Sequence, residues 1–285
     1  MPKYFLYKLA QLLALSMPVK NGYRLAEFAA DLYSMVAFLD RKWVVDNLKA
    51  IFPEKGNREI SIVRRQLFRN FAKYLVDFFR FDKLDMKYIK ENIHVRNMHY
   101  VDSALTEGNG VILLTAHLGN WELGGVVISM LGYPFITVAL RHKSKAVDAF
   151  FNRQRESKGV RVFPLGSAAK GCLRALKKNE LLGLVGDRDF TGKGVVIDFF
   201  AKPSVFPLGP AAISLKTKAR IIPGFMLRNK DDSFDLVMNK PIEYVPTGDN
   251  EKDIREILIR YKMVLEEYVR SYPEQWYMFR RFWKE

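Results

Sequence analysis

The fold of this chain is decided by the stretch VILLTAHLGNWE, which occupies residues 111–122. Its apolar half lies between Gly110 and Gly119, a pattern that predicts a buried strand of a parallel sheet. Asn120 is a residue type that caps helices, and Glu122 brings negative charge to a first helical turn, where the helix dipole favours it. We therefore expect a strand, a turn at His117 and a helix that begins after Asn120.

His117 and Glu122 have the residue types of a general base and of the group that orients it. Residues five apart on an ideal helix are separated by about 140°, so the two cannot share one helical face and His117 must lie in the turn. A carboxylate can keep one ring nitrogen protonated, which leaves the other nitrogen to take a proton from a substrate hydroxyl. The alternative is a histidine satisfied by backbone carbonyls at the edge of the core.

Apolar runs and helical patterns alternate through the rest of the chain. The predicted strands are 135–140, 160–164, 181–185, 220–227 and 234–238, and the predicted helices are 147–157, 168–178, 210–217 and 253–271. This alternation predicts an α/β sandwich with a largely parallel central sheet. No linker, repeat or low-complexity tract divides it, so we expect one catalytic domain, residues 46–285, after an N-terminal helical segment, residues 1–45.

Composition points to an anionic partner. The chain has 285 residues, a formal net charge of +15 and 49% hydrophobic residues, enough for a sizeable core. The basic residues are scattered and no zinc-finger or RNA-recognition motif is present, which argues against nucleic acid. The single cysteine, Cys172, excludes an intramolecular disulfide and is best explained as a small apolar residue of a helix.

The N-terminal segment is apolar but does not read as a membrane span. Residues 9–19 are uncharged, yet they are too few and Pro18 interrupts them; residues 25–39 contain Glu27 and Asp31. We expect two short helices, hinged near Pro18, that lie in the membrane interface. The alternative is that they only pack on the catalytic domain. No cleavage pattern of a signal peptide is convincing, so the site is expected on the cytoplasmic side.

Several motifs, in collinear order, resemble those of one enzyme family. The segment HLGNWE, residues 117–122, matches the His-x4-Glu signature of the lysophospholipid acyltransferase superfamily and is most similar to the lipid A lauroyl/myristoyl acyltransferase branch. VGDRD at 185–189 and PEQWYMFRRFW at 273–283 extend the resemblance, which covers residues 92–284. One departure is Arg188, where the family usually has Gln or His.

The resemblance implies an enzyme that transfers a fatty acyl group from acyl carrier protein or coenzyme A to a lipid hydroxyl, with His117 as base and Glu122 as its orienting carboxylate. The expected acceptor is a lipid A precursor of lipopolysaccharide biosynthesis, and the alternative is another glycolipid, such as a phosphatidylinositol mannoside, or a lysophospholipid. No cofactor and no metal are implied. The expected state is a monomer, monotopic or peripheral, on anionic lipid at the cytoplasmic face of the bacterial inner membrane.

Further residues near the motif are candidates for substrate binding. Backbone N–H groups of Gly119, Asn120 and Trp121 could stabilise the oxyanion, because they open a helix. The resemblance implies a role for Arg155, whose guanidinium suits a phosphate or an oxyanion. Its other interpretation is a surface or salt-bridged arginine, and Arg153 is the rival position.

Two aspartates follow the predicted strand 181–185, at the edge where parallel sheets commonly place functional groups. Asp187 and Asp189 are predicted to support the site by orienting its loop. The alternative is that they only cap a turn before Gly192 and Gly194.

The sequence argues against two other classes of enzyme and leaves one non-enzymatic alternative. A serine hydrolase would need a Gly-x-Ser-x-Gly elbow, which the sequence lacks. A metallohydrolase could use His117, Glu122, His142 and Asp187, but their spacing matches no HExxH helix. A non-catalytic membrane adaptor remains as the alternative that predicts no effect of replacing His117.

Overall fold

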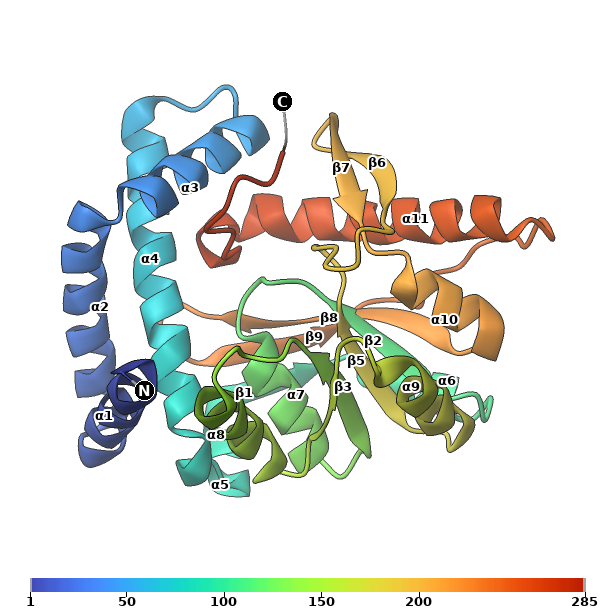
Figure 1. The fold of residues 1–285 in the computed structure, drawn as a ribbon, viewed down its shortest axis with the longest axis horizontal. Coiled ribbons are helices and arrows are strands. Elements are labelled where there is room, and N and C mark those ends of the chain that lie inside the picture. The colour runs from blue at the N-terminus through green and yellow to red at the C-terminus, as the bar shows by residue number, and fades with distance from the viewer. Residues whose placement is uncertain (1, 284–285) are drawn as a thin grey trace.

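The computed structural model describes residues 2–283, which form a mixed α/β fold (Figure 1). The helices are α1 (Pro2–Ser16), α2 (Val19–Val36), α3 (Phe38–Ile51), α4 (Asn57–Phe79), η1 (Phe81–Lys83), α5 (Met86–Asn92), α6 (His99–Leu105), α7 (Trp121–Met130), α8 (Lys145–Glu156), α9 (Ala168–Lys177), α10 (Gly209–Thr217), α11 (Asn250–Ser271) and η2 (Pro273–Gln275). The strands are β1 (Ile93–Arg96), β2 (Val111–Thr115), β3 (Phe135–Ala139), β4 (Arg161–Pro164), β5 (Leu181–Val185), β6 (Val195–Phe199), β7 (Lys202–Phe206), β8 (Arg220–Arg228) and β9 (Phe234–Met238).

The central sheet has seven strands in the order β1-β9-β8-β2-β5-β3-β4. From β8 to β4 the strands run parallel, whereas β9 is antiparallel to β8, and β1 runs parallel to β9. This confirms the predicted α/β fold with a largely parallel sheet. Consecutive carboxyl ends of β2, β5 and β3 therefore meet at one edge, where the loops after them can form a site.

Helices cover both faces of the sheet, so successive side chains of β2 enter two different cores. Ile112 and Leu114 lie in one apolar cluster, to which α9, α10 and α11 contribute. Val111 and Leu113 lie in the other, with residues of α6, α7 and α8. Burial on both faces explains why β2 is an uninterrupted apolar run rather than an alternating one.

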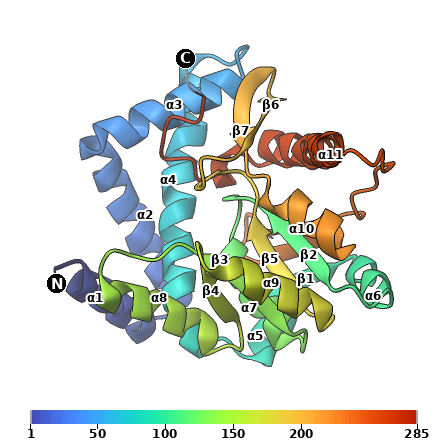
Figure 2. The same ribbon diagram turned by 45° about the vertical axis from the view of Figure 1, so that its right-hand side comes forward.

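The N-terminal helices pack against the long helix α4. Figures 1 and 2 both show α2 alongside α4, where Lys73 pairs with Glu27 at 2.8 Å and Arg69 pairs with Asp31 at 2.6 Å. The break between α1 and α2 falls beside Pro18, as predicted. The predicted division between residues 45 and 46 falls inside α3. Within residues 2–283, no helix combines the length and the apolar character that crossing a membrane requires.

The predicted helices and strands are found within a few residues of their expected bounds. The antiparallel hairpin of β6 and β7 was missed. Its turn places Phe200 and Ala201 at φ of 52° and 56°, a conformation that Asn and Gly normally signal. Without those residues the sequence carries no hairpin signature.

Candidate active site

The strand register places Asp187 beside His117. β2 and β5 are neighbours, with Thr115 opposite Val185, so residues two positions beyond each strand reach the same level of the sheet edge. His117 Nδ1 lies 2.7 Å from Asp187 Oδ1, and the His117 backbone N–H donates to Asp187 Oδ2 at 3.0 Å. The predicted support from Asp187 is thus a direct contact with the histidine.

The electrostatics of Asp187 fix the tautomer of His117. Asp187 is fully buried, and Trp276 Nε1 donates a third hydrogen bond to it at 3.1 Å. Burial alone would raise the pKa of this carboxyl, but the His117 charge and the hydrogen bonds from His117 and Trp276 lower it below its ordinary value. Because the ionised carboxylate can only accept, the neutral ring carries its proton on Nδ1, and Nε2 is left unprotonated.

Glu122 does not make the contact with His117 that we expected; it pairs with Arg155. The guanidinium donates to both carboxylate oxygens, Nε to Oε2 at 2.7 Å and Nη2 to Oε1 at 2.6 Å. Nη1 donates to Asn152 Oδ1 at 3.1 Å, so each of the three guanidinium nitrogens of Arg155 donates a hydrogen bond within the protein. Burial alone would lower the pKa of Arg155, but the Glu122 charge raises it above its ordinary value. Arg155 is therefore salt-bridged, and both it and the half-buried Glu122 line the same cavity as His117.

The backbone N–H groups expected to stabilise an oxyanion are partly used elsewhere. Gly119 N donates to Gln275 O at 2.9 Å, and Asn120 N donates to Met226 O at 2.7 Å. Gly119 has φ +65°, and a Cβ there would lie 2.0 Å from Met226 O, so only glycine fits this turn. Two of the three predicted donors therefore hold the loop against β8 and the C-terminal tail rather than face a substrate.

Asn120 begins α7 as predicted. Its Oδ1 accepts from Leu123 N at 3.1 Å, which satisfies one free N–H group of the first turn. Its Nδ2 donates to Asp77 of α4 at 2.8 Å. Asn120 is 2% exposed, so its role here is to fix the turn that carries His117.

The C-terminal tail closes over the histidine loop. Tyr277 N donates to His117 O at 2.8 Å, and the Gln275 side chain forms two hydrogen bonds of 2.9 Å with the backbone of Arg228. Trp276 is 2% exposed and reaches Asp187. In the sequence this tail was named as part of the family resemblance, but a contribution of Trp276 to the site was not predicted. The position of Trp276 in the shared motif PEQWYMFRRFW was the signal that could have indicated it.

Asp189 shapes the next loop instead of facing the histidine. Its Oδ1 accepts from Thr191 N at 2.8 Å and from Thr191 Oγ1 at 2.7 Å, and its Oδ2 accepts from Gly194 N at 2.9 Å. The turn-capping alternative is confirmed for Asp189 alone, and Asp187 and Asp189 have separate roles.

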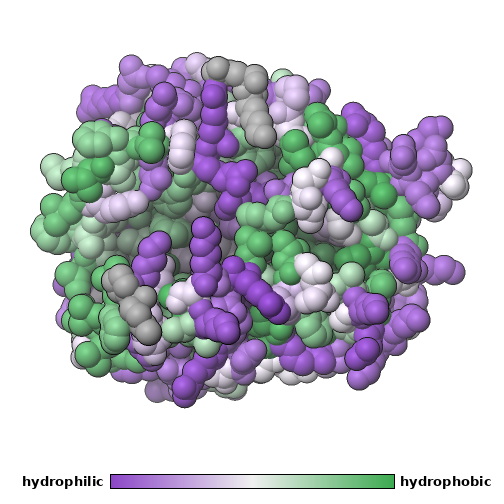
Figure 3. All heavy atoms as spheres, viewed as in Figure 1, coloured by the Kyte–Doolittle hydropathy of each residue, from purple (hydrophilic) through white to green (hydrophobic). Residues whose placement is uncertain are grey.

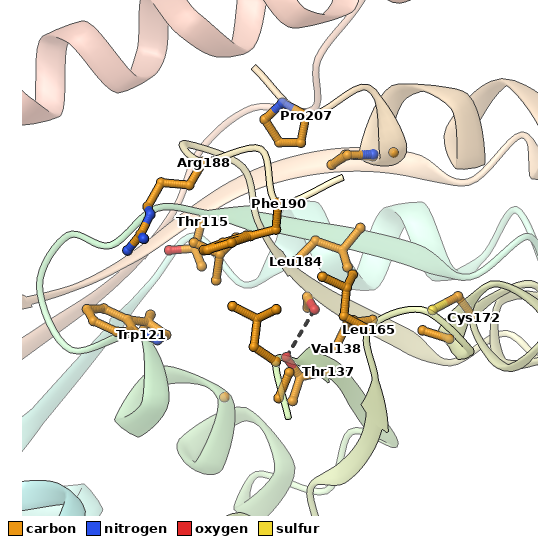
Figure 4. A pocket seen from close by; sticks show the side chains of 18 of the residues that line it. Thr115, Trp121, Thr137, Val138, Leu165, Cys172, Leu184, Arg188, Phe190 and Pro207 are labelled. Atoms are coloured by element: carbon orange, nitrogen blue, oxygen red, sulfur yellow. Dashed lines mark hydrogen bonds between the residues drawn. The ribbon is translucent and has the colours of Figure 1, made fainter. Parts of the chain in front are cut away.

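A cavity of about 500 Å³ opens at His117. Figure 4 shows Trp121 and Arg188 toward one end and Cys172 of α9 toward the other. Trp121 packs edge-on against the His117 ring, with centroids 5.1 Å apart. The lining is mainly apolar and includes Val126, Phe135, Val138, Leu165, Cys172, Leu184 and Ile213. The arrangement places the His117 imidazole on the wall of a largely apolar cavity, of a size that suits small-molecule ligands.

No three His, Cys, Asp or Glu side chains in the described part of the chain are grouped as a metal ion would need. His142, the second imidazole of the metal alternative, lines the same cavity, and its backbone N–H donates to Asp148 at 2.8 Å.

The chain is similar to curated proteins of two related names. A phosphatidylinositol mannoside acyltransferase of Mycolicibacterium smegmatis is 32% identical over 167 residues, which are 57% of this chain and 55% of that protein. This chain thus matches about half the length of the mycobacterial proteins. A lipid A biosynthesis acyltransferase of Haemophilus influenzae is 21% identical over 81% of this chain and 71% of its own length. A lipid A biosynthesis palmitoleoyltransferase of Escherichia coli is 24% identical over 83% of this chain and 76% of its own length.

The family comparison extends across all of the sequence, including the N-terminal helices. The family model described as bacterial lipid A biosynthesis acyltransferase matches residues 1–285, with the histidine loop, the Asp187 loop and the C-terminal tail inside the match. The chain belongs to the bacterial lipid A biosynthesis acyltransferase family.

Proposed function

We propose that this protein transfers a fatty acyl group from a thioester to a hydroxyl of a glycolipid, with His117 as general base. The observation that carries the proposal is the Asp187–His117 pair at the mouth of an apolar cavity. Family membership supports the reaction class, and the names of the relatives support glycolipid acceptors.

The chemistry follows from the tautomer. His117 Nε2 takes the proton of the acceptor hydroxyl as its oxygen attacks the thioester carbonyl. The ionised Asp187 stabilises the imidazolium that forms. When the tetrahedral intermediate collapses, the carbon–sulfur bond breaks and the imidazolium returns the proton to the thiolate. The ester is formed in one attack, with no acyl-enzyme.

The acyl chain occupies the cavity, whose lining extends from Trp121 at one end to Cys172 at the other (Figure 4). Burial of each methylene contributes about 0.8 kcal/mol, so a long chain supplies most of the binding free energy. The reacting carbonyl then lies at the polar mouth, beside His117 and Trp121.

The donor is an acyl carrier protein or coenzyme A thioester, and the net charge of +15 favours both, since each is anionic. The acceptor is a lipid A precursor in the first instance. The alternative acceptor is a phosphatidylinositol mannoside. The relative named for that acceptor is 32% identical to this chain over the aligned residues, compared with 21% for the Haemophilus influenzae lipid A enzyme.

The enzyme works at a membrane surface. Figure 3 shows hydrophobic residues along the side where α1 and α2 lie. The residues from 5 to 39 that are large, apolar and more than half exposed are Phe5, Leu6, Leu9, Leu12, Phe28, Leu32, Tyr33, Met35, Val36, Phe38 and Leu39. Exposed Lys3, Lys20 and Arg24 flank them and suit anionic headgroups. Peripheral attachment to the cytoplasmic face of a bacterial inner membrane fits these features.

The test is a transfer assay with radiolabelled acyl groups. Wild type and His117→Ala are given acyl carrier protein and coenzyme A donors together with lipid A precursors, phosphatidylinositol mannosides and lysophospholipids. We expect transfer to one glycolipid class and its loss in His117→Ala, while thermal unfolding stays near that of wild type. Transfer that survives in His117→Ala would refute the base, and absence of transfer to every acceptor would favour the adaptor.

A further inference from the structure

Arg188 stands at the mouth of the cavity with donors that the protein leaves unused. It follows the strand β5 and lines the cavity, and Figure 4 shows its side chain extending toward Trp121, at the end away from Cys172. Its Nε is buried and has no hydrogen-bond partner among residues 2–283. The guanidinium instead lies 4.7 Å from the centre of the Phe190 ring.

Two other arginines near the site, Arg155 and Arg228, are each neutralised by a carboxylate. Arg155 pairs with Glu122, and Arg228 pairs with Asp77. The carboxylate next to Arg188 is Asp187, whose oxygens already accept from His117 and Trp276. An unpartnered buried donor costs about 1–3 kcal/mol, so the position is expensive without a ligand.

A second positive charge, on the exposed Arg280, acts on Arg188. Burial and the charge of Arg280 both lower the pKa of Arg188, so the two guanidinium groups act on each other through space. The backbone of Arg280 is held by Asn47 of α3, whose Nδ2 donates to Arg280 O at 2.8 Å. The loop that carries Arg188 is held by Asp189 and its hydrogen bonds to Thr191. Two neighbouring like charges attract an anion more strongly than either does alone.

We propose that Arg188 binds a phosphate group of the substrate whose acyl chain or hydroxyl is placed at His117. Guanidinium groups bind phosphate oxygens in a bidentate manner, and the free Nε edge of Arg188 is suited to that contact. The inference rests on the proposed acyl transfer. The phosphate has two sources, the phosphopantetheine arm of the thioester donor or a phosphorylated glycolipid acceptor.

Binding to an inactive protein tests the site separately from the reaction. In the His117→Ala background, calorimetry compares octanoyl-coenzyme A with octanoyl-pantetheine, which lacks phosphate, and a phosphorylated lipid A precursor with its dephosphorylated form in micelles. The variants are Arg188→Gln and Arg188→Lys. The control is Arg174→Gln, which removes one positive charge from an exposed position of α9.

We expect Arg188→Gln to weaken binding of one phosphate-bearing ligand at least about tenfold, which is about 1.4 kcal/mol, and to leave binding of its phosphate-free partner unchanged. The ligand pair in which binding weakens identifies the source of the phosphate, either the thioester donor or the glycolipid acceptor. Arg188→Lys should lose part of the affinity, and Arg174→Gln none. A melting temperature within 2 °C or so of the parent keeps the comparison valid.

Two binding results would overturn the site: the parent binds both members of each pair equally well, or Arg188→Gln weakens binding of both members equally. A third would be a fall in kcat with every donor when Arg188→Gln is made in the active enzyme, while binding to the His117→Ala protein is unchanged. The last would make Arg188 a stabiliser of the oxyanion. If the binding pattern appears but wild type transfers no acyl group, the acyltransferase proposal fails and the phosphate site stands. If wild type transfers and the pattern is absent, the reverse holds.

Discussion

Replacing Asp187 by Asn should abolish the base without removing the histidine. Asp187 Oδ2 accepts two hydrogen bonds, from His117 N and Trp276 Nε1, whereas Oδ1 accepts one, from His117 Nδ1. The amide oxygen of Asn therefore takes the Oδ2 position and its NH2 group faces Nδ1. Nδ1 must then accept, and the proton moves to Nε2, which can no longer take one from the acceptor.

The magnitude follows from the worth of general-base catalysis, about 10²- to 10⁴-fold. That range corresponds to roughly 2.7 to 5.4 kcal/mol in the activation barrier. The apolar cavity is untouched by the change, so KM for the acyl donor should stay within about twofold while kcat falls. The loss should be specific to the buried carboxylate. Asp198→Asn, which removes a negative charge from an exposed position of β6, should keep the wild-type rate.

The assay is steady-state acyl transfer at neutral pH, with circular dichroism as the check on folding. A kcat for Asp187→Asn near that of wild type would refute the role of Asp187. A rise in KM at constant kcat would also refute it, because Asp187 would then act in binding.

The pH dependence of stability has a definite sign. Asp187 has a lowered pKa in the folded protein, so its ionised form stabilises the fold above the unfolded pKa of about 3.9. This contribution is lost as the pH falls through the folded pKa. The difference in unfolding free energy between wild type and Asp187→Asn should therefore be present at neutral pH and shrink as the pH falls below about 4, as measured by urea denaturation.

Three other predictions concern the Glu122–Arg155 ion pair, the apolar cavity and the exposed apolar surface of α1 and α2. Arg155→Met should destabilise the fold by about 1–3 kcal/mol, because it leaves the half-buried Glu122 carboxylate unpaired, and adding Glu122→Gln should restore most of the melting temperature. Cys172→Phe should shift the preferred donor to shorter acyl chains in a series of thioesters, while Cys172→Ala should not; an unchanged preference would place the chain elsewhere. Leu6→Asp with Leu9→Asp should reduce flotation with anionic vesicles and preserve activity on short-chain soluble substrates, and equal flotation would contradict the membrane surface.

The local features of the site could be predicted from neighbouring residues. The apolar run before His117 gave the strand, and Asn120 gave the start of α7. Both signals depend on a few consecutive residues, whose burial pattern and capping chemistry are visible in the sequence.

The partners of His117 could not be predicted in the same way. Asp187 lies 70 residues further along the chain and reaches His117 only because β5 is next to β2 in the sheet. Glu122 was the nearest carboxylate in sequence, but the first turn of α7 directs it to Arg155 of α8. Likewise, the backbone N–H group of Gly119 is taken by Gln275 from the far end of the chain. Strand order and tail packing are properties of the whole fold, which residue types and spacing do not encode locally.

Measuring which ring nitrogen of His117 carries the proton is the most direct test of its proposed role as a base. The chain has four histidines, so ¹⁵N-histidine labelling gives a simple NMR spectrum, and His117→Ala assigns the signal. We expect neutral His117 to carry its proton on Nδ1 in wild type and in Glu122→Gln, and on Nε2 in Asp187→Asn. A proton on Nε2 in wild type, or a switch caused by Glu122→Gln instead of Asp187→Asn, would contradict the assignment of Asp187 as the group that makes His117 a base.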